Sequence, residues 1–197
     1  MRQTWSHLAV AVSLLASSLW AFGQQAKTTQ SEPATAHFTA AELAAKVPAP
    51  KSEDVKSVDA IVAAAYAAIS GPAGARDWDR FRSLFLPEAR FTSVGKEQDG
   101  STVISSWSVD EFVRDAGAAF AKEGFYENGI VNKPDTYGGM TQVLSSYESR
   151  HAPGEKPFAR GVNSFQVVND GKRYWILSIF WDSERPDNPL PTALSRK

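Results

Sequence analysis

The sequence predicts an α+β domain in which three helices pack on a curved, mostly antiparallel sheet of about six strands. Segments with helical and strand patterns are segregated, in the order helix, helix, two strands, helix, four strands. The tight-turn triplet Asn169–Gly171 joins the last two strands as a hairpin. The chain of 197 residues is 43% hydrophobic, which is enough for one domain with its own core.

Charge and cysteine content exclude several classes of protein. The 21 basic and 22 acidic residues give a formal net charge of −1, without the basic excess of a protein that coats nucleic acid. We therefore expect no nucleic-acid partner. The chain has no cysteine, so it has no disulfide, no thiolate nucleophile and no cysteine-based zinc site.

Residues 1–23 have the pattern of a secretory signal peptide. Arg2 is followed by the apolar run Leu8–Trp20 and by the small-x-small site Ala21–Gly23. The run of about 13 residues is shorter than the roughly 20 that cross a bilayer, which disfavours the alternative of an uncleaved membrane anchor. We expect export, periplasmic or secreted, and a mature chain of 24–197 without a membrane span.

Residues 24–51 are rich in Ala, Thr, Gln and Pro, which is typical of a mostly disordered tether. Within this segment Thr39 and Glu42 form a capping-box pair, which predicts one or two helical turns before Pro48. The domain is expected over 52–184. The Pro-rich tail 185–197 is not expected to continue the sheet.

Three segments of the domain have a helical pattern. Apolar residues recur at helical spacing over Val55–Ile69. The second segment, Asp77–Leu86, is closed by Pro87. The third begins at the capping box Ser108–Glu111 and is expected to end at Gly124.

Six segments have the pattern of strands, at 90–94, 102–107, 125–131, 141–151, 158–168 and 173–182. The last strand is apolar on both faces, with Leu177 and Ile179 on one and Ile176 and Phe180 on the other. Such a strand is either central under two layers or part of a subunit interface, and we therefore expect a homodimer.

Alternation within the strands assigns side chains to the inner face of the sheet. In 158–168 the more apolar set places Asn163 inward, and in 141–151 it places Tyr147 inward. Glu148 falls in the polar set, toward solvent. The pattern leaves the direction of Glu127 open. A carboxylate in an apolar pocket would have a raised pKa and could serve as a base.

Five residues are candidates for binding a ligand in the interior. Tyr66 lies among alanines, which leave space beside its ring, and Trp181 ends the last strand. Each candidate also has a structural interpretation, as a core aromatic or as a hydrogen-bonded buried amide. The five are Tyr66, Trp78, Tyr147, Asn163 and Trp181.

No metal ion and no cofactor are expected. The mature chain has two histidines, His37 and His151, and they are not in a metal-binding spacing. The sequence also lacks the G-x-S-x-G elbow of serine hydrolases, the phosphate-binding P-loop and a dinucleotide fingerprint.

Three segments, Val62–Phe81, Phe85–Phe91 and Phe165–Trp181, carry a resemblance to a known superfamily. With the element order, they resemble the nuclear transport factor 2-like (NTF2-like) superfamily, in its SnoaL-like branch. These segments mark the fold and no catalytic site, and the superfamily hosts unrelated functions. The resemblance implies a cone-shaped roll with an apolar pocket between the helices and the concave sheet, often in a dimer.

The ketosteroid isomerase pattern of that superfamily is only partly present. Its helix-one tyrosine corresponds to Tyr66, but its general-base aspartate falls near Ser93 and its protonated aspartate near Asn163 or Ser164. A serine cannot take a carbon-bound proton as a carboxylate does, so a steroid isomerase of that type is rejected. The scytalone dehydratase pattern needs a pocket histidine, and His151 lies at the far end of a strand.

Three functions remain open. The first is an exported domain that binds a small, largely apolar organic molecule in its pocket, without known catalysis. The second is a lyase, isomerase or hydrolase that uses Tyr66 with a carboxylate such as Glu127, and it requires a carboxylate within hydrogen-bond reach of the pocket. The third is a non-catalytic homodimeric structural or partner-binding module whose own side chains fill the pocket.

Overall fold

The computed structural model describes residues 38–196. The predicted signal peptide 1–23, and residues 24–37 of the predicted tether, lie outside the described residues. Over 38–196, no helix combines the length and the apolar character that a membrane crossing requires.

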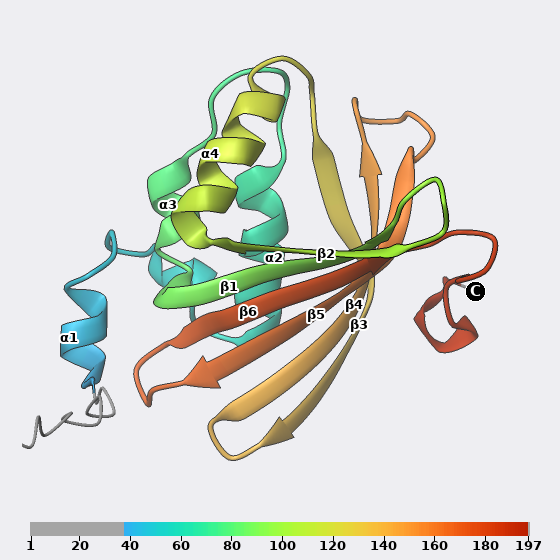
Figure 1. Cartoon of the computed structure of the whole chain (residues 1–197). Coiled ribbons are helices and arrows are strands. Elements are labelled where there is room, and N and C mark those ends of the chain that lie inside the picture. Colours follow the sequence, from blue (N-terminus) through green and yellow to red (C-terminus); the bar gives the residue numbers. More distant parts are fainter. Residues whose placement is uncertain (1–37, 197) are drawn as a thin grey trace, which may run out of the picture. The chain divides into compact units, whose positions relative to one another are not determined.

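A six-stranded mixed sheet forms the larger part of the fold, as Figure 1 shows. The spatial order is β2-β1-β6-β5-β4-β3, and every neighbouring pair is antiparallel except β1 with β6. The strands are β1 (Phe85–Lys96), β2 (Thr102–Ser108), β3 (Tyr126–Tyr137), β4 (Met140–Arg150), β5 (Ala159–Asn169) and β6 (Tyr174–Ser183). Register shifts between β1 and β6, β3 and β4, and β5 and β6 mark irregularities of the kind that bend strands.

Three helices lie together on one side of this sheet (Figure 1), which confirms the predicted α+β class. Of these, α2 packs on β3 and α4 packs on β1. The α-helices are α1 (Ala40–Ala44), α2 (Val58–Ile69), α3 (Trp78–Arg82) and α4 (Val109–Phe120), with 3-10 turns η1 (Ser52–Asp54) and η2 (Thr192–Leu194). The predicted capping boxes are present at Thr39 with Glu42 and at Ser108 with Glu111.

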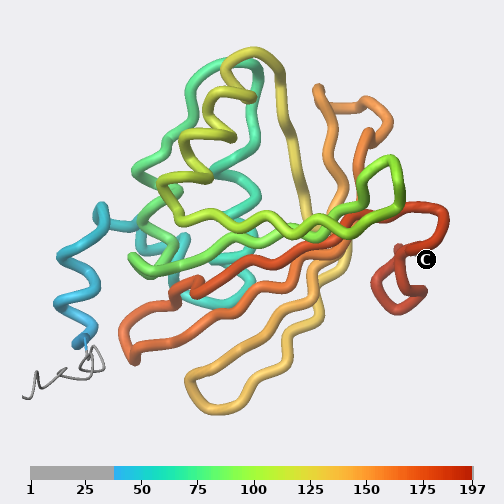
Figure 2. The backbone as a smooth tube through the Cα atoms, viewed as in Figure 1, coloured from blue at the N-terminus to red at the C-terminus, as the bar shows by residue number. Residues whose placement is uncertain are grey.

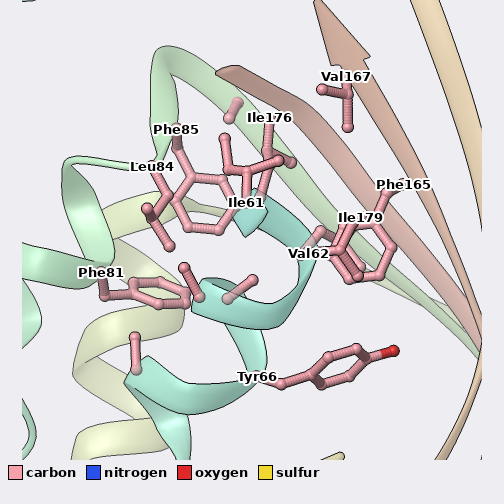
Figure 3. Close-up of a cluster of buried hydrophobic side chains, with 14 of the residues drawn as sticks. Ile61, Val62, Tyr66, Phe81, Leu84, Phe85, Phe165, Val167, Ile176 and Ile179 are labelled. Carbon is pink, nitrogen blue, oxygen red and sulfur yellow. The ribbon is translucent and has the colours of Figure 1, made fainter. Parts of the chain in front are cut away.

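The core lies between α2, α3 and the inner face of the sheet. Figure 3 shows Ile61 and Val62 of α2 facing side chains of β1, β5 and β6. Phe81 of α3 packs against Phe85 and Phe91 of β1, with ring centroids 4.7 and 5.8 Å away. These aromatic contacts fix α3 on the sheet and bury large apolar surfaces.

The second helix is shorter than predicted. α3 ends at Arg82 rather than Leu86, and β1 already begins at Phe85. Phe85 pairs with β6, and the pairing is then irregular as far as Arg90. Pro87 lies in this irregular stretch, so its missing N–H costs no regular ladder bond.

The predicted helix stop at Gly124 is also wrong. α4 ends at Phe120, and its cap, Ala121, has ordinary right-handed backbone angles. Gly124 serves another purpose, because a Cβ there would collide with the carbonyl oxygen of His151. A glycine therefore lets the chain after α4 approach the end of β4.

A bulge in β6 changes the predicted alternation of this strand. The pairing with β5 skips Leu177, so Ile176 and Ile179 both belong to the core. Leu177 and Phe180 are instead 42% and 47% exposed. The prediction that Leu177 shares a face with Ile179, opposite Ile176, is therefore wrong, and in residues 38–196 these outward side chains stay uncovered.

The C-terminal segment turns back after β6, as Figure 2 shows. Arg185 donates hydrogen bonds to Asp182, and Asn188 donates to the same carboxylate. Further along, Leu194 of η2 is buried, and η2 lies against β3. The tail does not continue the sheet and instead packs on the domain.

Candidate functional site

A cavity of about 260 Å³ lies between the helices and the inner face of the sheet. Its walls are mostly aromatic, and α2, α3, α4 and all strands except β2 contribute to them or to the adjoining loops. The lining residues are Ala65, Tyr66, Ile69, Phe81, Phe91, Phe112, Ala116, Phe120, Phe125, Glu127, Tyr147, Ser149, Phe158, Ala159, Asn163, Phe165, Ile179 and Trp181.

Strand register brings the polar groups of this cavity together. Glu127 of β3 pairs with Ser149 of β4, and Ser145 of β4 pairs with Asn163 of β5. Paired residues project on the same face of a sheet, and residues two apart on one strand share that face. These side chains therefore meet on the inner face, opposite Tyr66 of α2.

Two glycines leave space for the tyrosine rings of the cavity. A Cβ at Gly129 would lie 3.2 Å from the ring of Tyr66. A Cβ at Gly161 would lie 2.7 Å from the hydroxyl of Tyr147 and would collide with the carbonyl oxygen of Asp182. The packing of the site thus excludes a side chain at Gly161 and makes one at Gly129 a tight fit.

A hydrogen-bonded chain links the polar groups. Asn163 Nδ2 donates to the Tyr66 hydroxyl at 3.1 Å and to Glu127 Oε1 at 3.5 Å. The Tyr66 hydroxyl shares a second bond of 2.6 Å with Ser145 Oγ. Ser149 Oγ donates to Glu127 Oε2 at 2.7 Å. The Asn163 amide thus connects the phenol to the carboxylate.

Glu127 is the acidic residue of the cavity wall. Burial raises the pKa of its carboxyl to about 7, and the bonds from Ser149 and Asn163 offset only part of that effect. Among residues 38–196, no Lys, Arg or His nitrogen lies within 4.0 Å of its oxygens. Near neutral pH the group therefore exchanges between acid and carboxylate, as a proton-transfer residue requires.

The two tyrosines of the cavity stay protonated at neutral pH. Burial raises the pKa of Tyr66, and it also raises the pKa of Tyr147. The negative Glu127 acts in the same direction on both. The Tyr147 hydroxyl lies 3.3 Å from Ser183 Oγ. Both phenols therefore offer neutral hydroxyl groups to a bound molecule.

Phe158 marks the mouth of the cavity. It lines the cavity and is nevertheless 51% exposed. Its ring stacks on the imidazole of His151 at 4.1 Å and tilts against Phe125 at 6.2 Å. Phe125 stacks in turn on Phe120 at the end of α4. Access to the interior is thus framed by aromatic rings from α4 and the β4–β5 loop.

The structure brings four of the five candidate residues to this cavity. Tyr66, Tyr147 and Asn163 contribute polar atoms, and Trp181 forms part of the wall and stacks on the ring of Trp107. Trp78 is not among the lining residues. Its indole packs against aromatic rings of α3 and α4, at 5.6 and 6.2 Å, because α3 turns that side chain outside the cavity.

Glu127, whose direction the sequence left open, and Ser149, which was not a candidate, also line the cavity. The available signal was alternation at the start of β3, where Glu127 lies two residues after Phe125 and both line the cavity. The alternation was not recognisable there, because residues 126–128 read Tyr-Glu-Asn and Glu127 therefore has a polar neighbour on each side. Glu148, expected toward solvent, pairs with Arg150 at 2.6 Å and does not line this cavity.

Metal-ligating geometry is not found among residues 38–196, where no three His, Asp or Glu side chains are arranged to hold an ion. The polar groups of the cavity are a carboxylate, two phenols, an amide and serine hydroxyls. This set suits hydrogen bonding and proton transfer to an organic molecule.

No protein-family model matches the chain, and no curated protein matches it. Among solved structures, a protein of unknown function with a cystatin-like fold from Nostoc punctiforme has a TM-score of 0.51 and 10% identity, over 68% of this chain and 92% of its own. An uncharacterised cystatin-like protein from Caulobacter vibrioides has a TM-score of 0.49 and 14% identity, over 67% and 90%. An NTF2-like protein of unknown function from Silicibacter pomeroyi has a TM-score of 0.44 and 15% identity, over 66% and 94%.

The Nostoc likeness concerns the fold and carries no activity with it. It covers about two thirds of the chain at a low identity. The described chain therefore has a cystatin-like α+β fold, and the α+β class is the one that its sequence pattern predicted.

Proposed function

We propose that the cavity binds a small, largely apolar organic molecule with one polar end. The observation that supports this proposal is that the cavity wall consists of a large apolar part and a small polar part. Aromatic rings surround most of the space, whereas Glu127, Asn163 and Tyr66 form one connected polar cluster. Ligand sites typically combine apolar walls with a few convergent polar groups in this way.

The cavity volume limits the size of the ligand. A dry apolar cavity of roughly 150 Å³ holds benzene. By proportion, the cavity of about 260 Å³ accommodates roughly ten non-hydrogen atoms. A monocyclic aromatic molecule with a short polar side chain fits this limit.

Filling the cavity tests the proposal. Ala116 lines the cavity from α4, so Ala116→Leu should abolish the thermal stabilisation that 2-phenylethanol gives to the unmodified protein. Ala118→Leu, on the exposed side of the same helix, is the matched control and should leave that stabilisation unchanged. Equal stabilisation of both variants would show that the probe binds elsewhere. Gly161 is unsuitable for filling, because its Cβ would collide with the β6 backbone.

A second candidate function is proton transfer in a lyase or isomerase. The observation that favours it is the position of Glu127, a carboxyl with a pKa raised to about 7, on the wall of an apolar cavity beside the neutral phenol of Tyr66. A base with this pKa is matched to neutral pH, and a neutral phenol can stabilise a developing oxyanion.

Isotope exchange tests this second candidate. With 1-phenyl-2-propanone in D₂O, the protein should accelerate exchange of the protons next to the carbonyl, as followed by proton NMR. Glu127→Gln removes the base and should return exchange to the buffer rate. The exposed control Glu97→Gln should retain the acceleration. If Glu127→Gln and the unmodified protein exchange at equal rates, Glu127 is not a base for this probe.

We also propose that the chain is exported, on the signal-peptide pattern of residues 1–23. Expression of the full chain in an exporting bacterial host should release a product of 24–197 outside the cytoplasm. The intact mass of the product measures the cleavage site directly. Recovery of the full-length chain from the cytoplasm alone would contradict export.

A further inference from the structure

We propose that the ligand of this cavity is a cation, namely a small arylalkyl amine whose ammonium group pairs with Glu127 while its ring lies against the aromatic walls. This inference rests on the proposed binding function and names its ligand class. It follows from the charge of the cavity rather than from its shape.

The carboxylate of Glu127 has spare acceptor capacity. An ionised carboxylate accepts hydrogen bonds at about four lone-pair positions. Here Oε2 accepts one bond of 2.7 Å from Ser149, and Oε1 accepts a single long bond of 3.5 Å from Asn163. Both donors are neutral, and among residues 38–196 every ion pair is formed by other acidic groups. A buried charge without a counter-ion is costly, and an entering cation would relieve that cost.

The walls of the cavity also favour a cation. The faces of aromatic rings carry negative electrostatic potential and attract ammonium groups within about 6 Å. No Lys, Arg or His side chain is among the residues that line the cavity. An organic anion would therefore meet Glu127 without a compensating positive group among the lining residues, whereas an ammonium would meet no cationic side chain among them.

The direction of the pH dependence separates a cationic ligand from a neutral one. An amine that is protonated throughout needs the ionised carboxylate, so its affinity should rise as the pH passes upward through the pKa of Glu127, about 7. A neutral ligand displaces water from the same group and favours its protonated form, so its affinity should fall over that range. The other titratable lining groups, Tyr66 and Tyr147, stay protonated, because burial raises the pKa of each. At the mouth, His151 faces Glu123 at 3.3 Å and also stacks on Phe158.

Three probes of similar size and different charge test the inference: 2-phenylethylamine, 2-phenylethanol and phenylacetate. Calorimetric titration at pH 6 and pH 8 would compare their affinities for the full protein. We expect the amine to bind roughly tenfold or more tightly than the alcohol at pH 8, with a smaller preference at pH 6. Phenylacetate should bind most weakly of the three.

Single substitutions test whether this preference for the amine depends on the carboxylate of Glu127. Glu127→Gln preserves size and removes the charge, and it should remove both the preference for the amine and its pH dependence. Glu97→Gln, at an exposed position, should behave as the unmodified protein. His151→Gln removes the titratable group at the mouth and should leave the pH dependence intact.

The outcomes distinguish this inference from the function on which it rests. If 2-phenylethanol binds as tightly as the amine, or if the preference survives in Glu127→Gln, the cationic ligand class is wrong and the binding function stands. If none of the three probes binds, the proposed binding function fails, and the inference fails with it.

Discussion

At the scale of single residues, Glu127 is the acidic group of the cavity wall, and the proposed ligand class depends on it. Its backbone is anchored, since the Glu127 amide donates to Ser70 Oγ, and that hydroxyl donates to the Glu127 carbonyl. The carboxylate is held between Ser149 and Asn163 and cannot swing to solvent without losing both bonds. A carboxylate held in this way is present in one geometry, ready for an incoming group.

The same residue makes stability depend on pH. The native pKa of Glu127 is raised to about 7 from 4.5, so the native state holds a proton that the unfolded state releases. This contribution is fully present below pH 4.5 and is lost as the pH rises through 7. Because glutamine does not titrate, Glu127→Gln does not lose this stability as the pH rises. Relative to the unmodified protein, the variant should gain up to about 3 kcal/mol between pH 4.5 and pH 8.

Urea unfolding of both proteins across this pH range, without added ligand, measures the effect. Glu97→Gln controls for the removal of an acidic group at an exposed site. A constant difference between Glu127→Gln and the unmodified protein at all pH values would contradict a raised native pKa.

Sequence patterns correctly indicated three polar groups of the cavity, namely Tyr66 on α2 and Tyr147 and Asn163 on the inner face of the sheet. Period-two alternation sufficed for the two strand residues, because their neighbours differ clearly in polarity. Alternation was uninformative at Glu127, where the adjacent side chains are also polar. Which carboxylate enters an apolar cavity depends on the strand register, which a single sequence does not specify.

At the scale of elements, caps and turns were more predictable than element ends. The Asn169–Gly171 turn and the capping box at Ser108 are local signals, and both are present. The end of α3, in contrast, depends on the pairing of the next strand, β1, with β6, which is distant in the sequence. Phe81 and Phe85 have helical spacing, yet Phe85 is drawn into the pairing of β1 with β6. Tertiary contacts of this kind override local propensity.

The close approach of β5 and β6 at Gly161 predicts that a side chain there would destabilise the fold. Gly161→Ala places a Cβ against the Asp182 carbonyl and the Tyr147 ring, so it should destabilise the fold by about 1–3 kcal/mol. Gly95→Ala is the matched control, because it lies in a strand with open space around its Cβ position, and it should change stability by less than about 0.5 kcal/mol. Thermal or urea unfolding compares the two variants, and equal stabilities would contradict the packing at Gly161.

At the scale of the whole molecule, the order of the elements was sufficient to predict the fold, whereas the cavity could be recognised only in the structure. The order of helices and strands is local information that leaves few arrangements open. Cavity volume depends on the strand register, on the bulge at Leu177 and on how far α2 and α4 lie from the sheet. Alanines beside Tyr66, such as Ala65, indicated space next to its ring, but the cavity itself is apparent only in the folded chain.

The homodimer expected from the sequence stays a prediction, and the outer face of the sheet is where it can be tested. The outer face of the sheet presents Leu144, Leu177 and Phe180, all exposed. If this face joins two copies, Phe180→Glu should shift the mass in light scattering from dimer to monomer, since burying an unpaired charge is unfavourable. Tyr137→Glu, at the end of β3 near the β3–β4 turn, is the control and should leave the mass unchanged. A monomer for the unmodified chain at all concentrations would contradict the dimer.

Whether the cavity is the proposed ligand site can be determined by an NMR titration. Labelled protein would be titrated with 2-phenylethanol and with 2-phenylethylamine, while the methyl signals of Ile69 and Ile179 and the indole signal of Trp181 are followed. We expect saturable shifts at these three residues, with no change at the outward-facing Leu144 and Leu177. Shifts on the outer face alone, or none for either probe, would contradict it.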